Sequence, residues 1–122
     1  MIWQVALAAA FGAAARYALD SCLSSRRVGA FPWGTFAVNI SGSLALGLLV
    51  GWVLAQELSP AYRVVLGTGF LGAYTTFSTW MLETLRLIER GARGLAFLNL
   101  AGSWAAGTAA AAAGLWIALG LS

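Results

Sequence analysis

Four long apolar stretches make up most of this sequence, and each is long enough to cross a lipid bilayer as a helix. They cover residues 2–23, 33–54, 61–89 and 95–121, and only short connections separate them. A membrane-spanning helix needs about 20 mainly apolar residues. The chain has 122 residues, of which only 9% are charged, against about 25% in soluble domains. We therefore predict an all-α membrane protein in which residues 1–122 form a single domain of four transmembrane helices.

The connections between these stretches carry most of the charge. Arg26 and Arg27 lie in the first connection, Arg90 and Arg93 lie in the third, and Glu57 lies in the second. Because short cytoplasmic loops are enriched in arginine and lysine, we expect the first and third connections in the cytoplasm and both termini outside. The formal net charge of +3 is thus a topology signal, and we expect no binding of nucleic acid.

Side chains suited to catalysis are scarce. The sequence contains no histidine and one cysteine, Cys22. Histidine is the commonest metal ligand and the usual acid–base group near neutral pH. The 4 acidic residues form no pair at a spacing suited to acid–base chemistry. We therefore predict that the chain is not an enzyme and has no catalytic residues.

The third apolar stretch contains a segment rich in glycine and hydroxyl side chains, residues 67–80 (GTGFLGAYTTFSTW). At membrane depth, an interrupted helix is tolerated only where protein or a water-filled cavity satisfies its backbone. Broken membrane helices often bind ions, cations at free carbonyl groups and anions at free N–H groups. We expect the third helix to break near residues 72–76 and this segment to form an ion site.

Polar and small residues recur at every fourth position in the second and fourth stretches: Asn39, Ser43, Gly47 and Gly51, and then Asn99, Ser103, Gly107 and Ala111. Residues four apart share one face of a helix. Such a face either packs closely against another helix or lines a polar pathway. Both interpretations stay open for most of these residues. For Asn39, the cost of an unpaired amide at membrane depth favours a functional role.

Two aromatic residues and one arginine add further candidates. Phe77 and Trp80 lie three residues apart, hence on one helix face, and Glu83 follows at the same interval. The edge of an aromatic ring is positive, so it favours a small anion without offering a full charge. Packing is the alternative role for both rings. Arg16 either extends toward the membrane surface or forms an electropositive vestibule for anions.

Several motifs resemble those of a known family. Residues 12–17 (GAAARY), 34–43 (GTFAVNISGS) and 69–79 (GFLGAYTTFST) are similar to the GAxxRY, GTxxVNxxGS and GFxGxxTTFST motifs of the Fluc (CrcB) fluoride channels. Asn99, Ser103 and Gly107 fit the pattern NxxxSxxxG of the family's fourth helix. The motifs occur in the family's order and touch all four stretches, and the third motif is the most specific.

This resemblance implies a fold, an activity and a set of residues. Fluc channels are antiparallel, dual-topology homodimers of four-helix subunits with the third helix broken. They export toxic cytoplasmic fluoride across the cell inner (plasma) membrane, by passive electrodiffusion through two pores at the dimer interface. A structural sodium ion (Na+) lies where the two broken helices cross, and the backbone carbonyls of Gly72 and Thr75 would hold it here. The other implied residues are Asn39, Phe77, Thr79, Trp80 and Ser103 in the fluoride pore and Arg16 in the vestibule.

Two places in the sequence depart from the family, and one other function stays open. Ala8 and Ala9 stand where the family often has a pair of glycines, a change that we expect to affect packing only. Trp80 stands where the family has a second pore phenylalanine; an indole keeps a positive edge and adds an N–H donor, which leaves its role undecided. The charge bias of the connections suits a fixed orientation, so a heterodimer is an alternative to the homodimer. The alternative function is a small dual-topology multidrug or cation exporter. Such an exporter needs a carboxylate well inside its first helix, where this chain has Arg16, with Asp20 near the end.

Overall fold

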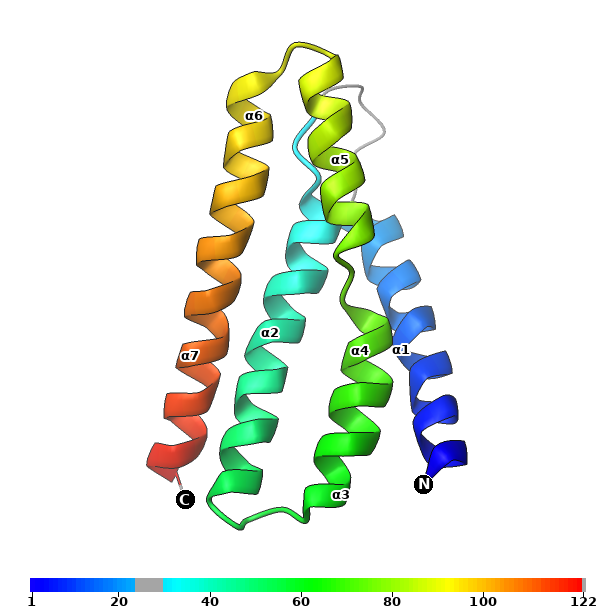
Figure 1. Ribbon diagram of the computed structural model, residues 1–122, viewed down its shortest axis with the longest axis vertical. Helices are drawn as coiled ribbons and strands as arrows, with labels where there is room; N and C mark the ends of the chain where they lie inside the picture. Colours follow the sequence, from blue (N-terminus) through cyan, green and yellow to red (C-terminus); the bar gives the residue numbers. More distant parts are fainter. Residues whose placement is uncertain (24–29, 122) are drawn as a thin grey trace.

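The computed structural model describes residues 1–23 and 30–121, and these residues form 4 helical rods with no strand among them. The rods run along the long axis of the molecule (Figure 1). The two termini lie at the same end, beside the connection between the second and third rods (Figure 1). The predicted all-α architecture is therefore confirmed.

The first two rods are uninterrupted α-helices, α1 (Ile2–Leu23) and α2 (Trp33–Leu54). Pro32 precedes α2 at its N-cap, where a residue without an N–H leaves no donor unsatisfied. Gln56 follows α2 with a positive φ of 64° and turns the chain back. The next helix begins at Pro60, and Ser59 Oγ accepts a hydrogen bond from the Ala61 N–H at 3.3 Å.

The third rod is composite and broken. It consists of α3 (Pro60–Tyr62), the π-helix η1 (Arg63–Leu71), the single turn α4 (Gly72–Tyr74) and, after an interruption, α5 (Ser78–Glu89). Thr75 has φ −80° and ψ 159°, which is an extended conformation. The chain between α4 and α5 is visibly unwound in Figure 1. The glycine- and threonine-rich segment thus interrupts the helix, as its composition predicts.

The fourth rod is continuous and contains α6 (Arg93–Phe97), the π-helix η2 (Leu98–Gly102) and α7 (Ser103–Leu121). Gly91, with a positive φ of 80°, makes the turn that connects it to α5, a conformation that glycine adopts without strain. In the described residues, 3 helices are long and apolar enough to cross a membrane: Ile2–Leu23, Trp33–Leu54 and Arg93–Gly120. The chain is therefore a membrane protein.

Glycines set the closest contacts between the rods. A Cβ atom on Gly47 would collide with the carbonyl oxygen of Ala111 on α7, and a Cβ on Gly12 of α1 would collide with that of Phe70 on η1. Small residues let helix backbones approach in this way when lipid supplies no hydrophobic driving force. The third rod packs mainly against α1, while α7 packs mainly against α2. An open groove lies between the third rod, α2 and α7.

Candidate ion site at the helix break

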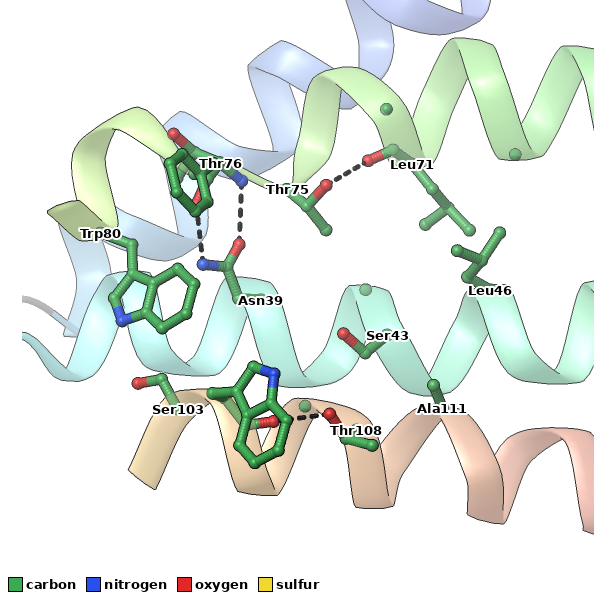
Figure 2. A pocket seen from close by; sticks show the side chains of 16 residues that line it. Asn39, Ser43, Leu46, Leu71, Thr75, Thr76, Trp80, Ser103, Thr108 and Ala111 are labelled. Atoms are coloured by element: carbon green, nitrogen blue, oxygen red, sulfur yellow. Dashed lines mark hydrogen bonds between the residues drawn. The ribbon is translucent and has the colours of Figure 1, made fainter. Parts of the chain in front are cut away.

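The groove has a volume of about 470 Å³ and lies beside the interruption of the third rod. Residues of α2, of the third rod and of α7 line it (Figure 2). Its polar lining includes Asn39, Ser43, Thr75, Thr76, Ser103 and Thr108. None of the described residues that line it carries a charge. The groove is therefore uncharged, with these polar side chains set in a mostly apolar lining.

Asn39 joins α2 to the interruption through two hydrogen bonds. Its Nδ2 donates to the Thr76 carbonyl oxygen at 2.8 Å, and its Oδ1 accepts from the Thr76 N–H at 2.8 Å. The backbone N–H can only donate, so this pairing fixes which side of the amide carries the oxygen. Figure 2 shows both bonds on the groove side of α2. An amide nitrogen carries two donors, and among the described residues the Thr76 carbonyl is the acceptor for one of them, which leaves the second proton on Nδ2 available there.

The interruption diverts two backbone N–H groups from their helical acceptors. In a continuous α-helix, the Thr76 N–H would donate to the Gly72 carbonyl and the Thr79 N–H to the Thr75 carbonyl. Here the Thr76 N–H donates to Asn39 Oδ1 at 2.8 Å, and the Thr79 N–H donates to Thr76 Oγ1 at 3.2 Å. The carbonyls of Gly72 and Thr75 have therefore lost their α-helical donors. They are the two carbonyls to which the sequence resemblance assigns the sodium ion.

Two further contacts hold α4 against α2. Ser41 Oγ lies 2.8 Å from the Tyr74 hydroxyl oxygen, within hydrogen-bond distance. A Cβ atom on Gly42 would lie 3.2 Å from the Tyr74 ring and would collide with the Thr75 methyl group. Thr75 Oγ1 also donates to the Leu71 carbonyl at 2.9 Å. The position of the interruption is thus fixed by α2 as well as by the local sequence.

Two aromatic rings lie where α5 resumes. Phe77 and Trp80 make an edge-to-face pair, with ring centroids 5.6 Å apart and planes at 88°. Phe77 is 70% exposed in the single chain, and both residues line the groove. The indole Nε1–H of Trp80 donates to the Asn99 carbonyl at 2.8 Å. The N–H that distinguishes Trp80 from a phenylalanine is therefore already engaged within the protein.

The structure brings together six of the candidate residues from the sequence and leaves two outside. Asn39, Gly72, Thr75, Phe77, Trp80 and Ser103 all line the groove. Thr79 and Arg16 are half-buried residues that do not line it. Asn99, whose role the sequence left open, is 0% exposed and lies behind Trp80 and Ser103.

Among the polar pairs that sequence reasoning missed, that of Thr35 and Glu83 had a usable signal in the sequence. The Thr35 hydroxyl donates a hydrogen bond to Glu83 Oε1 and so links α2 to α5. Thr35 lies four residues before Asn39 and therefore shares its helix face. That spacing was a usable signal, since it extends the polar face of α2 by one turn toward α5.

Fold and groove together define a small membrane protein with four helical rods and an uncharged groove, dotted with polar side chains, beside a broken helix. The family described as "CrcB-like protein, Camphor Resistance (CrcB)" matches residues 3–115. The chain belongs to this CrcB-like family.

Several relatives share nearly the whole chain. It is 48% identical over 122 residues to "Fluoride-specific ion channel FluC 1" of Streptomyces avermitilis, covering 99% of this chain and 98% of the relative. It is 50% identical over 124 residues to the protein of the same name in Symbiobacterium thermophilum, covering 99% and 97%. It is 44% identical over 118 residues to "Fluoride-specific ion channel FluC 2" of Mycobacterium tuberculosis, covering 96% and 90%. These names describe ion channels, in agreement with the prediction that the chain is not an enzyme.

Proposed function

We propose that this chain forms a fluoride-selective ion channel that exports cytoplasmic fluoride by passive electrodiffusion. The observation that carries the proposal is the groove itself, in which amide, hydroxyl and ring-edge donors meet beside a broken helix without a charged lining residue. Membership of the CrcB-like family and the names of the relatives support it. The membrane would be the cell inner (plasma) membrane, across which the exported ion leaves the cytoplasm.

Passive export is sufficient for this substrate. Hydrogen fluoride is a weak acid that crosses lipid as a neutral molecule and ionises inside, which traps fluoride in the cytoplasm. An inside-negative potential drives the anion outward by about 2.3 kcal/mol per charge per 100 mV. A selective pore is then enough to remove it.

The donors of the groove suit an ion that must be dehydrated and then released. Fluoride holds its water strongly, so the pore must replace water with other donors. The second N–H of Asn39 and the ring edge of Phe77 belong to groove-lining residues. Ser103 also lines the groove, and its hydroxyl would serve the ion by turning away from Asn99 Oδ1, to which it donates in the single chain. Conduction also requires binding weak enough for the ion to leave. Neutral donors meet that requirement better than an arginine or lysine would.

A second copy of the chain would complete the pore. The groove is open along one side, and two of its lining residues, Phe77 and Trp104, are 70% and 67% exposed. Polar groups of the groove would otherwise face lipid, which offers them no partner. An antiparallel, dual-topology homodimer covers two such grooves symmetrically and gives two pores. A heterodimer of fixed orientation is the alternative, to which the arginine bias of the connections points.

A structural Na+ fits the interruption. The carbonyls of Gly72 and Thr75 lack their α-helical donors because the N–H groups of Thr76 and Thr79 are bonded elsewhere. In the described residues no group of three or more His, Cys, Asp or Glu side chains is placed to hold a metal ion, so backbone oxygen would be the ligand. Two copies crossing at this point would contribute these carbonyls from both chains. The ion would supply a positive charge that offsets the facing carbonyl dipoles.

The direct test uses the purified chain alone in proteoliposomes loaded with potassium fluoride. A potassium ionophore sets the potential, and a fluoride electrode records efflux. We expect fast fluoride efflux and far slower chloride efflux, with protein-free liposomes as the baseline. Equal rates for the two anions would overturn the proposal. Efflux only after a second, different subunit is added would select the heterodimer over the homodimer.

The exporter alternative gains no support from the first helix. A proton-coupled exporter of cations needs a carboxylate at membrane depth to exchange the proton for the drug. The acid in this helix, Asp20, lies in the last turn of α1 (Ile2–Leu23). Proton-driven uptake of a cationic dye into the same liposomes would favour the exporter.

A further inference from the structure

Asn99 is fully buried and does not line the groove, yet its side-chain amide and backbone carbonyl make four hydrogen bonds that involve a side chain. Its Nδ2 donates to Thr84 Oγ1 at 2.8 Å and to the Trp80 carbonyl at 3.4 Å. Its Oδ1 accepts from Ser103 Oγ at 3.4 Å, and its backbone carbonyl accepts from the Trp80 indole N–H at 2.8 Å. A buried network of this kind fixes the groups that it joins.

We infer that Asn99 is a positioning residue that keeps the indole N–H of Trp80 out of the groove, so that Trp80 offers an anion only the carbon edge of its ring. This inference rests on the proposed fluoride function. It assigns to Asn99 a role in tuning how strongly the pore holds its ion, and it explains how tryptophan serves at a position where phenylalanine would also fit.

Hydrogen bonds connect Asn99 both to the backbone of Trp80 and to its ring, and both connections support this role. Thr84 Oγ1 donates to the Trp80 carbonyl at 2.9 Å while accepting from Asn99 Nδ2 at 2.8 Å. The backbone of α5 at Trp80 is therefore tied to the Asn99 side chain, and the Trp80 ring is tied to the Asn99 carbonyl. Rotating the indole N–H into the groove would break the ring contact and leave the carbonyl without that donor.

The local backbone at Asn99 also favours the contact. Asn99 lies in the π-helix η2 (Leu98–Gly102), and its carbonyl still accepts the backbone N–H of Ser103. A carbonyl oxygen has two lone pairs, so it accepts the indole N–H as well. Short π-helical turns are often found at functional sites. Here the turn presents the carbonyl to α5 at the level of the helix break.

The consequence for an anion follows from donor strength. A hydrogen bond from an N–H group to an anion is charge-assisted and about twice as strong as a neutral one. A ring edge offers only the weaker attraction of its quadrupole. If the indole N–H were released into the groove, fluoride would be held longer and conducted more slowly. Asn99 thus keeps the second aromatic position of the groove weakly attractive.

The first test observes the indole N–H directly by NMR on the full chain, labelled with ¹⁵N-tryptophan and ¹⁵N-asparagine, in lipid nanodiscs. The Trp80 and Asn39 side-chain signals are assigned by their loss in Trp80→Phe and Asn39→Leu. Sodium fluoride then replaces sodium chloride at constant ionic strength. We expect the Asn39 amide signal to move and the Trp80 Nε1–H signal to stay in place. Movement of both signals would overturn the inference while leaving the proposed function intact. A fixed Asn39 signal together with absent fluoride efflux would remove the proposed function itself.

The second test is a double-mutant cycle on fluoride efflux, with Asn99→Leu measured beside Trp80 and beside Trp80→Phe. Asn99→Leu keeps the backbone carbonyl that accepts the indole N–H, but it removes the side-chain bonds to Thr84 Oγ1 and to the Trp80 carbonyl that hold α5 in position for that contact. One additional hydrogen bond on the anion slows its release about tenfold, so Asn99→Leu should lower efflux about tenfold when the indole of Trp80 can turn toward the groove. In the Trp80→Phe background the loss should be about twofold or less, because no N–H remains to be released. Equal losses in both backgrounds would show a purely structural role and overturn the inference.

A matched pair of variants at Thr84 separates the effect of its hydroxyl on efflux from the effect of its packing. Thr84 is 6% exposed, so Thr84→Val keeps its shape and removes the hydroxyl, whereas Thr84→Ser keeps the hydroxyl. We expect Thr84→Val to act in the same direction as Asn99→Leu and Thr84→Ser to conduct like the parent chain. Trp116→Phe, on a residue that is 79% exposed on α7, controls for loss of a tryptophan elsewhere. If Asn99→Leu does not assemble, the NMR titration of the parent chain decides alone.

Discussion

The pairing of Asn39 with Thr76 predicts what holds the helix break in place. Replacing Asn39 with leucine removes both 2.8 Å hydrogen bonds and leaves the Thr76 N–H and carbonyl without protein partners. An unsatisfied buried polar group costs about 1–3 kcal/mol, so two of them cost about 2–6 kcal/mol. Because Asn39 is half-buried and faces an open groove, water offsets part of this loss. We therefore expect the lower end of the range, about 2 kcal/mol.

The measurement is hydrogen exchange of the Thr76 amide in the full chain. A cost of about 2 kcal/mol corresponds to a roughly 30-fold faster exchange of this amide in Asn39→Leu. Asn39→Asp keeps an oxygen acceptor for the Thr76 N–H, so its protection should stay within about threefold of the parent. Ser41→Ala is the control, since it removes the neighbouring contact with Tyr74 and leaves Asn39 unchanged.

The two variants also separate structure from conduction. Asn39→Asp should keep Thr76 protected but lower fluoride efflux, because a carboxylate in the groove repels an anion. Asn39→Leu should lower both. Unchanged Thr76 exchange in Asn39→Leu would refute the reasoning, since it would mean that the backbone at the break is held by something other than this amide.

Three further predictions follow from the packing, the rings and the carbonyls. In a denaturant titration, Gly114→Val should destabilise the chain by about 1–3 kcal/mol, because a Cβ at Gly114 would lie 2.8 Å from the Leu48 nitrogen. Gly120→Val is the control and should be neutral, because a Cβ there would have nothing within 4 Å. Phe77→Ile should reduce fluoride efflux at least tenfold by removing the ring edge while the oligomer, measured by size-exclusion chromatography, stays intact; normal efflux would exclude Phe77 from the pore. Replacing sodium by N-methylglucamine throughout purification should weaken the oligomer and slow efflux, and full activity without sodium would contradict the proposed Na+ site.

Much of the fold can be predicted from the sequence because lipid imposes strict rules. A helix is the simplest way to satisfy backbone hydrogen bonds in a bilayer, so the four apolar stretches indicate four helical rods. The interruption is also predictable, since Gly72 and the following threonines weaken a helix in lipid. The exact position of the interruption is harder to predict. The extended residue is Thr75, and the resumed helix begins at Ser78, because Asn39 and Gly42 of α2 contact the chain at that point.

The two π-helices could not be predicted, because no residue pattern in residues 63–71 or 98–102 distinguishes them from an α-helix. One of them, η2, carries the Asn99 carbonyl that accepts the Trp80 indole N–H of α5.

The candidate site, like the fold, could be predicted from the sequence only in part. Spacing along each helix was enough to group Asn39 with Ser43 and Phe77 with Trp80, and the groove contains all four. Spacing could not reveal that Asn39 binds the backbone of Thr76, since every residue carries the same backbone groups. Nor could it distinguish Asn99, which is fully buried, from Ser103, which lies four residues later and lines the groove.

The central claim is selectivity for fluoride, and the reversal potential of a single reconstituted channel tests it most directly. A planar bilayer separates fluoride from chloride at equal concentration, with sodium on both sides. The account predicts a reversal potential displaced far toward the Nernst potential of fluoride, since the neutral donors of the groove replace the hydration of the smaller anion. A reversal potential near zero, or one displaced toward chloride, would contradict it.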